Sequence, residues 1–386
     1  MELKKNVTFI YTDKTEYQQL YPIYLECKKR GYKVEMSNNI FKKNEIGVYC
    51  QHLCYPENSK FSVILFHDIG QRHGEWPNMW QYEPWNKFNI GILPSKEWTD
   101  RWYSVSEYST TNPKNGVVEL GWPKFDRILE EGIQKDINEI KKKLDPNKKT
   151  ILYAPSWEND NKQDEFVKSM LNLKEKVNIL IKQAWYNEEI FPERVKDIKK
   201  MYRLHKEIEG VTILPPETNI FDAILVSDIL VSEESSTMFE AMLLGIPSVA
   251  VTDWKIPDVV PSRFAIVPYS FVEKTEKRNL TLTVKNILEN YSFKKKEIIN
   301  YRDRNFKNLG KASIEITNLL DLIVAKEKVT YIKGKKITRK VTIFNNMHYR
   351  KYNIIKIKNW IKNRIIFKSK ILKKLFFKYK EMRGKN

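Results

Sequence analysis

The sequence predicts an α/β protein made of two doubly wound halves, each with a parallel sheet, which face a cleft and precede a basic helical tail. At 386 residues the chain exceeds what one hydrophobic core usually supports. Short apolar runs alternate with amphipathic helical patterns, and this alternation starts again after the turn Asp145-Pro146-Asn147. We therefore predict Rossmann-like domains over residues 1–145 and 146–327, and a tail over residues 328–386.

The first half contains six short apolar or β-branched runs that are typical of strands. Between the first two, Thr15–Arg30 carries its apolar residues at the spacing of one helix face. The predicted strands are Val7–Tyr11, Lys33–Glu35, Gly47–Cys50, Phe61–Phe66, Asn89–Leu93 and Val117–Leu120.

The second half repeats the pattern with five predicted strands, separated by helices over Asp164–Lys174, Glu188–Glu209 and Ser236–Leu244. In doubly wound sheets, ligands bind beyond the carboxyl ends of the strands. We therefore look for functional residues just after these five runs, which are Thr150–Ala154, Val177–Lys182, Val211–Leu214, Asp228–Ser232 and Ser248–Thr252.

The charge distribution, the cysteines and the lengths of the apolar runs indicate the cellular compartment and the kind of membrane contact. Of the net charge of +20, almost all lies in residues 328–380, which hold 18 Lys or Arg and no Asp or Glu. The three cysteines lack the spacing of a zinc site or a disulfide framework, so we expect a reducing cytoplasm. We also expect no bound metal and no cofactor. With no signal-like apolar region and no run of about 18 apolar residues, we expect peripheral membrane contact only.

The tail combines basic residues with an apolar periodicity. Between Ile354 and Phe377, apolar residues recur at helical spacing with Lys and Arg between them. This pattern predicts an interfacial helix on anionic lipid, which places residues 346–386 at the inner face of the cell membrane. The alternatives are a helix packed on the protein with a solvated basic face, or a nucleic-acid contact, which we rank lowest.

The most specific local pattern is the polar turn and helix start within Ser232–Pro247. Hydroxyl side chains at a helix start, here Ser235, Ser236 and Thr237, place donors around an anion and suit a diphosphate. The alternative is a capping box, in which the Glu240 side chain turns back onto the backbone at the helix start.

Three further turns follow predicted strands. Pro155, Ser156 and Trp157 can offer donors and an aromatic face to a base or ribose, although a turn with a half-buried Trp would read the same way. Two of the chain's five His, His67 and His73, follow Phe61–Phe66, where either could act as a general base or be a surface residue. The other candidates for the cleft are Asp68, Gly70, Arg72, Gly121 and Pro123, although Pro123 also fits a helix start.

Four of these stretches together resemble the CDP-glycerol glycerophosphotransferase family, whose bacterial enzymes build teichoic acids and related capsular or surface polymers. The stretches span roughly residues 60–320, in the family's order and spacing. His67 with Gly70 resembles its His-Gly segment, and Gly121–Asp126 is similar to its Gly-x-Pro-x-x-Asp turn. Leu152–Trp157 and Ser227–Pro247 resemble its Leu-Tyr-Ala-Pro-Thr-Trp and Ser-Asp, Ser-Ser and Pro runs.

The resemblance implies a GT-B-like fold and transfer of a polyol phosphate from a CDP-activated donor to a lipid-linked or growing surface glycan, with CMP leaving. His67 would then take the acceptor's proton, Lys182 would add positive charge at the diphosphate, and Glu240 would bind the ribose. One departure is Lys182-Gln183-Ala184-Trp185, where the family has Lys-x-His-Pro. A nucleotide-sugar glycosyltransferase or a non-catalytic membrane-surface assembly protein remain the alternatives.

Overall fold

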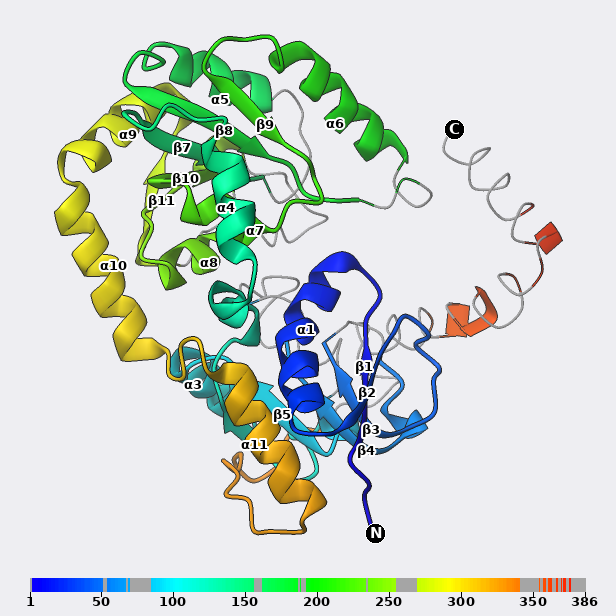
Figure 1. Ribbon diagram of the computed structural model, residues 1–386. Coiled ribbons are helices and arrows are strands. Elements are labelled where there is room, and N and C mark those ends of the chain that lie inside the picture. Colours follow the sequence, from blue (N-terminus) through cyan, green and yellow to red (C-terminus); the bar gives the residue numbers. More distant parts are fainter. Residues whose placement is uncertain are drawn as a thin grey trace.

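The described part of the chain forms two wholly parallel sheets of six strands each, one above the other in Figure 1. The computed structural model describes residues 2–50, 54–66, 69, 85–155, 162–186, 188, 192–233, 235–254, 269–340 and scattered positions between 354 and 375. Most central strands are buried on both faces, as parallel sheets covered by helices require. The prediction of two doubly wound α/β domains is confirmed.

The first sheet has the strand order β2-β1-β3-β4-β5-β6, so its order reverses between β1 and β3. All six strands match the predicted runs to within a few residues. Their bounds are β1 Asn6–Ile10, β2 Lys33–Ser37, β3 Asn44–Tyr49, β4 Ser59–Ile64, β5 Ile90–Leu93 and β6 Val117–Glu119.

The second sheet has the order β12-β11-β10-β7-β8-β9, which is the Rossmann order, with its reversal between β7 and β10. Five strands were predicted, and the structure adds β12 at the edge. Their bounds are β7 Lys149–Tyr153, β8 Val177–Lys182, β9 Val211–Leu214, β10 Ile229–Ser232, β11 Ser248–Val251 and β12 Val272–Thr275.

Helices cover both sheets and connect them. In Figure 1, α1 lies between the two sheets, and α10 runs along one side of the molecule from the second domain to the first. The helices are α1 Lys14–Lys29, α3 Lys96–Val105, α4 Ile133–Lys141, α5 Lys162–Leu171, α6 Pro192–His205, α7 Ile220–Leu225, α8 Thr237–Leu243, α9 Leu280–Glu289, α10 Tyr291–Asn305 and α11 Ala312–Val324. The short 3-10 helix η3, Pro123–Leu129, joins the domains.

Helix α11 packs on the first domain, although its sequence position follows the second. Asp321 accepts hydrogen bonds from Arg30 at 3.0 Å and from the Tyr32 hydroxyl at 2.8 Å. The apolar face of α11 joins the core of the first sheet through Ile316, Leu319 and Leu320. The boundaries at residues 145 and 327 stay a prediction, and the structure adds this return crossing of the chain.

After α11 the chain stays with the first domain. Ile332 forms an antiparallel bridge with Val117 of β6, and Arg339 forms a parallel bridge with Tyr108. The start of the predicted tail therefore covers the β6 edge of the sheet. Among the described residues, no helix is both long and apolar enough to cross a bilayer.

Candidate active site

The carboxyl ends of β7, β8 and β10 lie side by side next to the reversal of strand order in the second sheet. Pro155 follows β7, Lys182 ends β8 and Ser232 ends β10, and Pro155 and Ser232 are buried. This is the edge of a doubly wound sheet at which ligands bind. The predicted donor residues that the structure describes thus come from adjacent strand ends.

The turn after β10 gathers hydroxyl groups at the start of α8. The Ser235 hydroxyl accepts a hydrogen bond from the Thr237 backbone N–H at 3.2 Å. The Thr237 hydroxyl is buried and has no hydrogen-bond partner among the described residues. Ser236 takes the N-cap position without a capping bond from its side chain. Hydroxyl groups are therefore left available for a ligand.

Glu240 forms a buried ion pair with Lys124, which lies 116 residues earlier in the chain. The two side chains are 7% and 3% exposed for Lys124 and Glu240 respectively. Glu240 Oε1 accepts from Lys124, so the alternative of a capping box is wrong for this helix. Glu240 Oε2 is buried and has no hydrogen-bond partner in the described part of the chain. A donor such as a ribose hydroxyl would satisfy it.

Lys182 adds a second cation beside this pair. Its pKa is lowered to about 8, mainly by burial and next by the nearby charge of Lys124, while Glu240 opposes both effects. Lys182 therefore carries a positive charge at neutral pH and loses it as the pH rises above about 8. A cation with this property at a strand end suits an anionic ligand.

The turn Gly121–Asp126 positions Lys124 by anchoring α11. Gly121 has a φ of +93°, and an added Cβ atom would lie 2.8 Å from the carbonyl oxygen of Lys307. Asp126 accepts hydrogen bonds from the Ser313 backbone N–H at 2.7 Å and from its hydroxyl at 2.6 Å. Burial raises the pKa of Asp126, and these bonds oppose the rise. The turn thus binds α11 on one side and presents Lys124 to α8 on the other.

The stretch after β8, where the family's second His is absent, belongs to a buried polar network. Gln183 donates to the side chain of Gln163, whose amide lies 3.4 Å from His205 Nδ1. His205 Nε2 lies 3.3 Å from Asp164 Oδ1. Gln183 is therefore part of the packing between β8, α5 and α6, whereas the neighbouring Trp185 is exposed.

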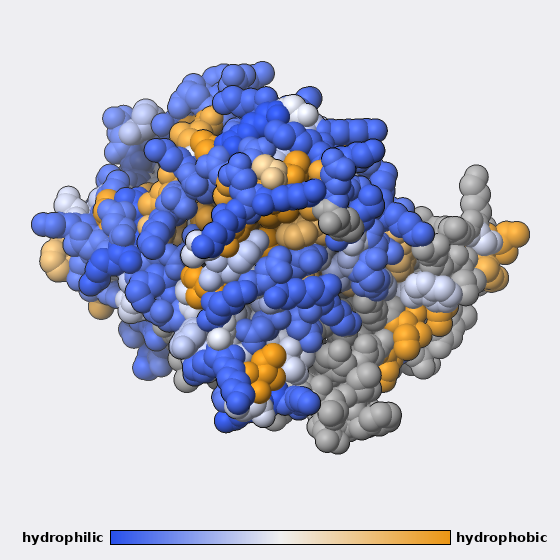
Figure 2. Space-filling model, turned by 90° about the horizontal axis from the view of Figure 1, so that it is seen from below, coloured by the Kyte–Doolittle hydropathy of each residue, from blue (hydrophilic) through white to orange (hydrophobic). Residues whose placement is uncertain are grey.

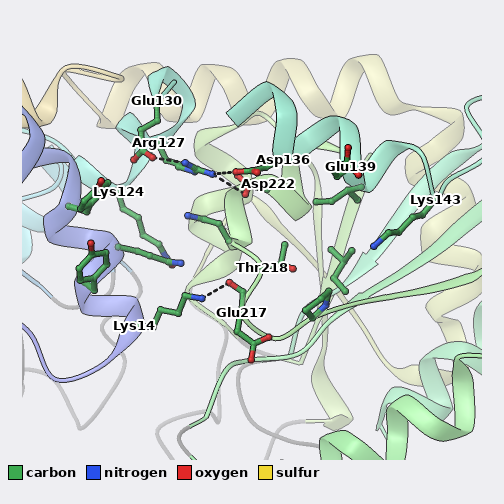
Figure 3. A pocket seen from close by; sticks show the side chains of 17 residues that line it. Lys14, Lys124, Arg127, Glu130, Asp136, Glu139, Lys143, Glu217, Thr218 and Asp222 are labelled. Atoms are coloured by element: carbon green, nitrogen blue, oxygen red, sulfur yellow. Dashed lines mark hydrogen bonds and ion pairs between the residues drawn. The ribbon is translucent and has the colours of Figure 1, made fainter. Parts of the chain in front are cut away.

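A cavity of about 480 Å³ opens beside the Lys124–Glu240 pair, between α1, the segment η3–α4 and the turn that joins β9 to α7. Figure 3 shows Lys14 reaching across it to the backbone oxygen of Glu217, at 2.8 Å. On the opposite wall Arg127 contacts Asp136 at 2.7 Å and Asp222 at 3.2 Å. The cavity therefore has walls from both domains.

This wall was not predicted from the sequence. Lys124 stood inside the quoted Gly121–Asp126 turn but was not singled out, and Lys14, Arg127 and Asp222 were not considered. Arg127 follows Lys124 by three residues, and Asp222 follows the Asn219 cap of α7. The only sequence feature that could have indicated this wall is the presence of basic residues, Lys124 and Arg127, in a turn between two predicted domains.

Several predicted site residues lie outside the described part of the chain, namely His67, Asp68, Gly70, Arg72, His73, Ser156 and Trp157. The described residues next to them along the chain show which strand precedes each group. His67 follows β4 by three residues, and the carbonyl of buried Ile69 accepts a hydrogen bond from Trp98 Nε1 at 3.1 Å. Ser156 and Trp157 follow Pro155 at the end of β7. Pro123 is described and begins η3.

Comparisons with known proteins complete these observations. The family model for CDP-glycerol:poly(glycerophosphate) glycerophosphotransferase matches residues 85–322. Among solved structures, the wall teichoic acid polymerase TagF matches with a TM-score of 0.61 and 18% identity, over 84% of this chain and 90% of that chain. UDP-GlcNAc 2-epimerase from Neisseria meningitidis matches with a TM-score of 0.54 and 15% identity, over 82% of this chain and 99% of that chain. No curated protein matches in a sequence comparison.

The two kinds of comparison agree with the fold. Both structural relatives share the arrangement of two parallel-sheet domains, which confirms the GT-B-like prediction. The family match covers more than half of the chain, including η3, β7, β8 and α8. The protein therefore belongs to the CDP-glycerol:poly(glycerophosphate) glycerophosphotransferase family and is an enzyme of the CDP-glycerol-type glycerophosphotransferase class.

Proposed function

We propose that this enzyme transfers glycerol phosphate, or a closely related polyol phosphate, from a CDP-linked donor to a hydroxyl group of a lipid-linked or growing surface glycan. One observation carries the proposal. Glu240 and Thr237, both on α8 at the carboxyl edge of the second sheet, each keep a buried oxygen without a partner among the described residues, and Glu240 lies close enough to Lys182 to affect its pKa. A ligand with both hydroxyl and phosphate groups complements this set.

The donor is held by residues from three strand ends. Glu240 Oε2 accepts a hydrogen bond from a ribose hydroxyl, while Ser235, Ser236 and Thr237 donate to the diphosphate. Lys182 offsets the phosphate charge, as the His of the family's Lys-x-His-Pro stretch would otherwise help to do. The turn Pro155, Ser156 and Trp157 contacts the nucleotide.

The proposed reaction is the transfer of a phosphoryl-linked glycerol group. The acceptor's hydroxyl oxygen attacks the phosphorus that bears the glycerol, and the bond from that phosphorus to the bridging oxygen breaks. CMP leaves with the electron pair, and the product is a phosphodiester. His67 takes the acceptor's proton, with His73 as the alternative base. Asp68 or Arg72 adjusts the pKa of this His. Lys182 and the hydroxyl donors stabilise the charge that develops on the leaving phosphate.

Nucleotide selectivity tests the proposal. A ligand that binds only the folded state raises the melting temperature with its concentration. We expect CDP and CMP to stabilise the full chain more than UDP or GDP, and His67→Ala to abolish transfer while it keeps the CDP response. Preference for UDP or GDP would redirect the assignment to a nucleotide-sugar glycosyltransferase, and no response to any of them would contradict a donor site.

The tail supplies the proposed membrane contact. Between residues 354 and 375, most of the apolar residues that the structure describes are exposed, including Ile354, Ile357, Trp360 and Ile371. Figure 2 shows hydrophobic side chains on the projecting segment at its right edge, whereas the visible face of the body is mostly hydrophilic. Each basic residue near an anionic surface contributes about 1 kcal/mol to binding.

Vesicle sedimentation tests this contact. The full chain should sediment with vesicles that contain anionic lipid and much less with neutral vesicles. Removal of residues 346–386 should abolish sedimentation while CDP still stabilises the protein. Equal recovery of the full and shortened chains with anionic vesicles would refute peripheral attachment through the tail.

A further inference from the structure

A row of tyrosines runs along α1 and ends at the interdomain cavity. Tyr17, Tyr21 and Tyr24 occupy one helix face at spacings of four and three residues. The rings of Tyr17 and Tyr21 stack with centroids 5.3 Å apart and planes 21° apart, and those of Tyr21 and Tyr24 with 5.8 Å and 13°. Tyr11 contacts Tyr17 edge-on at 5.2 Å. The row is a continuous aromatic surface.

Two of these rings, Tyr17 and Tyr21, line the cavity of about 480 Å³. Both are half-buried, and neither hydroxyl makes a hydrogen bond to another residue that the structure describes. Burial raises the pKa of Tyr17, and its tyrosine neighbours raise it further, so its hydroxyl stays protonated and can donate. Gln18 and Thr218 add polar groups to the same wall. An aromatic surface beside a few polar groups is typical of a ligand site.

The charges around the cavity exclude a polyanion as the favoured occupant. Among the residues that the structure describes, five carboxylates face four cations in its wall, which leaves a formal charge of −1. The main cations are already engaged, because Arg127 contacts three carboxylates and Lys124 contacts Glu240. A chain of glycerol phosphates would need an excess of unpaired positive charge. An uncharged ring with apolar C–H faces and peripheral hydroxyls fits better.

We propose that this tyrosine-lined cavity is the acceptor subsite and binds an uncharged sugar unit of the glycan, with one face of the sugar ring against Tyr17 and Tyr21. The inference rests on the proposed transfer to a glycan and adds the chemistry of the acceptor. Because Lys124 lines the cavity and contacts Glu240, a sugar bound here lies next to the donor site. The enzyme then adds its group to a sugar-bearing acceptor in preference to a polyol-phosphate chain.

The test measures sugar binding separately from donor binding, on the full chain. Saturation-transfer NMR uses methyl β-glucopyranoside and methyl N-acetyl-β-glucosaminide as uncharged probes and tri(glycerol phosphate) as the charged one. Thermal stabilisation by CDP is measured in parallel. Tyr17→Ala and Tyr21→Ala remove rings from the cavity, and Tyr24→Ala is the matched control because Tyr24 continues the row without lining the cavity.

We expect binding of at least one methyl glycoside, weakened about fivefold to tenfold by Tyr21→Ala and Tyr17→Ala and unchanged by Tyr24→Ala. The CDP response should stay intact in all three, which also shows that they fold. The inference is overturned if sugar signals persist without the two rings, if tri(glycerol phosphate) binds more tightly than the sugars, or if CDP displaces the sugar competitively. If CDP does not stabilise the protein but the sugars bind as expected, the donor assignment is contradicted and the sugar-site inference is kept.

Discussion

Lys124→Met would leave the buried Glu240 carboxylate without the cation that contacts it. Met fills a similar volume but carries no charge, and the two side chains of the wild-type pair are only 7% and 3% exposed. Breaking a buried ion pair by removing one partner costs about 3–5 kcal/mol, because the remaining charge has lost both water and its counter-ion. We expect a loss of stability of this size in urea unfolding.

A double-mutant cycle separates the pair from general damage at the site. Glu240→Gln removes the other charge, and the double variant removes both, so it should be more stable than the sum of the single losses predicts. For residues in direct contact we expect a coupling energy of about 1–3 kcal/mol. Single losses that add to within about 0.5 kcal/mol would show that Lys124 and Glu240 do not support each other, and would refute the reasoning.

The same variants report on the donor. If Lys124 orients Glu240 toward a ribose hydroxyl, the wild-type chain should bind CDP more tightly than 2′-deoxy-CDP. The ratio of the two affinities should fall toward one in Lys124→Met and Glu240→Gln. Lys14→Met is the matched control, because Lys14 lines the same cavity but donates to the backbone oxygen of Glu217. An unchanged affinity ratio in Lys124→Met would show that the ion pair contributes to folding stability but not to recognition of the ribose.

Three further outcomes are expected. Because the pKa of Lys182 is lowered to about 8 from the ordinary 10.5, CDP affinity should fall as pH rises from 7 to 9, and Lys182→Met should remove this dependence in titrations. The folded pKa lies below the unfolded one, so the Lys182 contribution to stability should rise between pH 8 and 10.5, with the opposite trend contradicting its burial. Asp126→Asn, which weakens the cap on α11, should cost about 1–3 kcal/mol in unfolding while the CDP response is kept. Gly121→Ala should destabilise the chain by at least about 1 kcal/mol, measured by urea unfolding, because its φ of +93° and the Lys307 oxygen both oppose a Cβ atom; a neutral effect would refute this account of the turn.

Much of the fold could be predicted because strand and helix signals are local. The run Val177–Lys182 was predicted to the residue, and α1 differed from its predicted bounds by one residue at each end. Such runs are apolar along their length because parallel strands are buried on both faces. β12, Val272–Thr275, was missed because two of its four residues are exposed and charged, which gives an edge strand no apolar signal.

The candidate site divides in the same way. Ser235, Ser236 and Thr237 could be found from sequence, because a strand, a polar turn and a helix follow one another directly along the chain. The pairing of Glu240 with Lys124 could not be found, because it joins residues 116 positions apart through the docking of two domains. No local pattern records which side chain of another domain meets a given carboxylate.

The sequence by itself thus determined the two doubly wound halves, the positions of the strand ends and the concentration of positive charge in the tail, since each depends on neighbouring residues. Only the tertiary structure decided that α11 returns to the first domain, that Asp126 caps it, and that Lys124 and Tyr17 face the same cavity. These contacts depend on burying surfaces from distant segments against one another, and their energies exist only once the two sheets have docked.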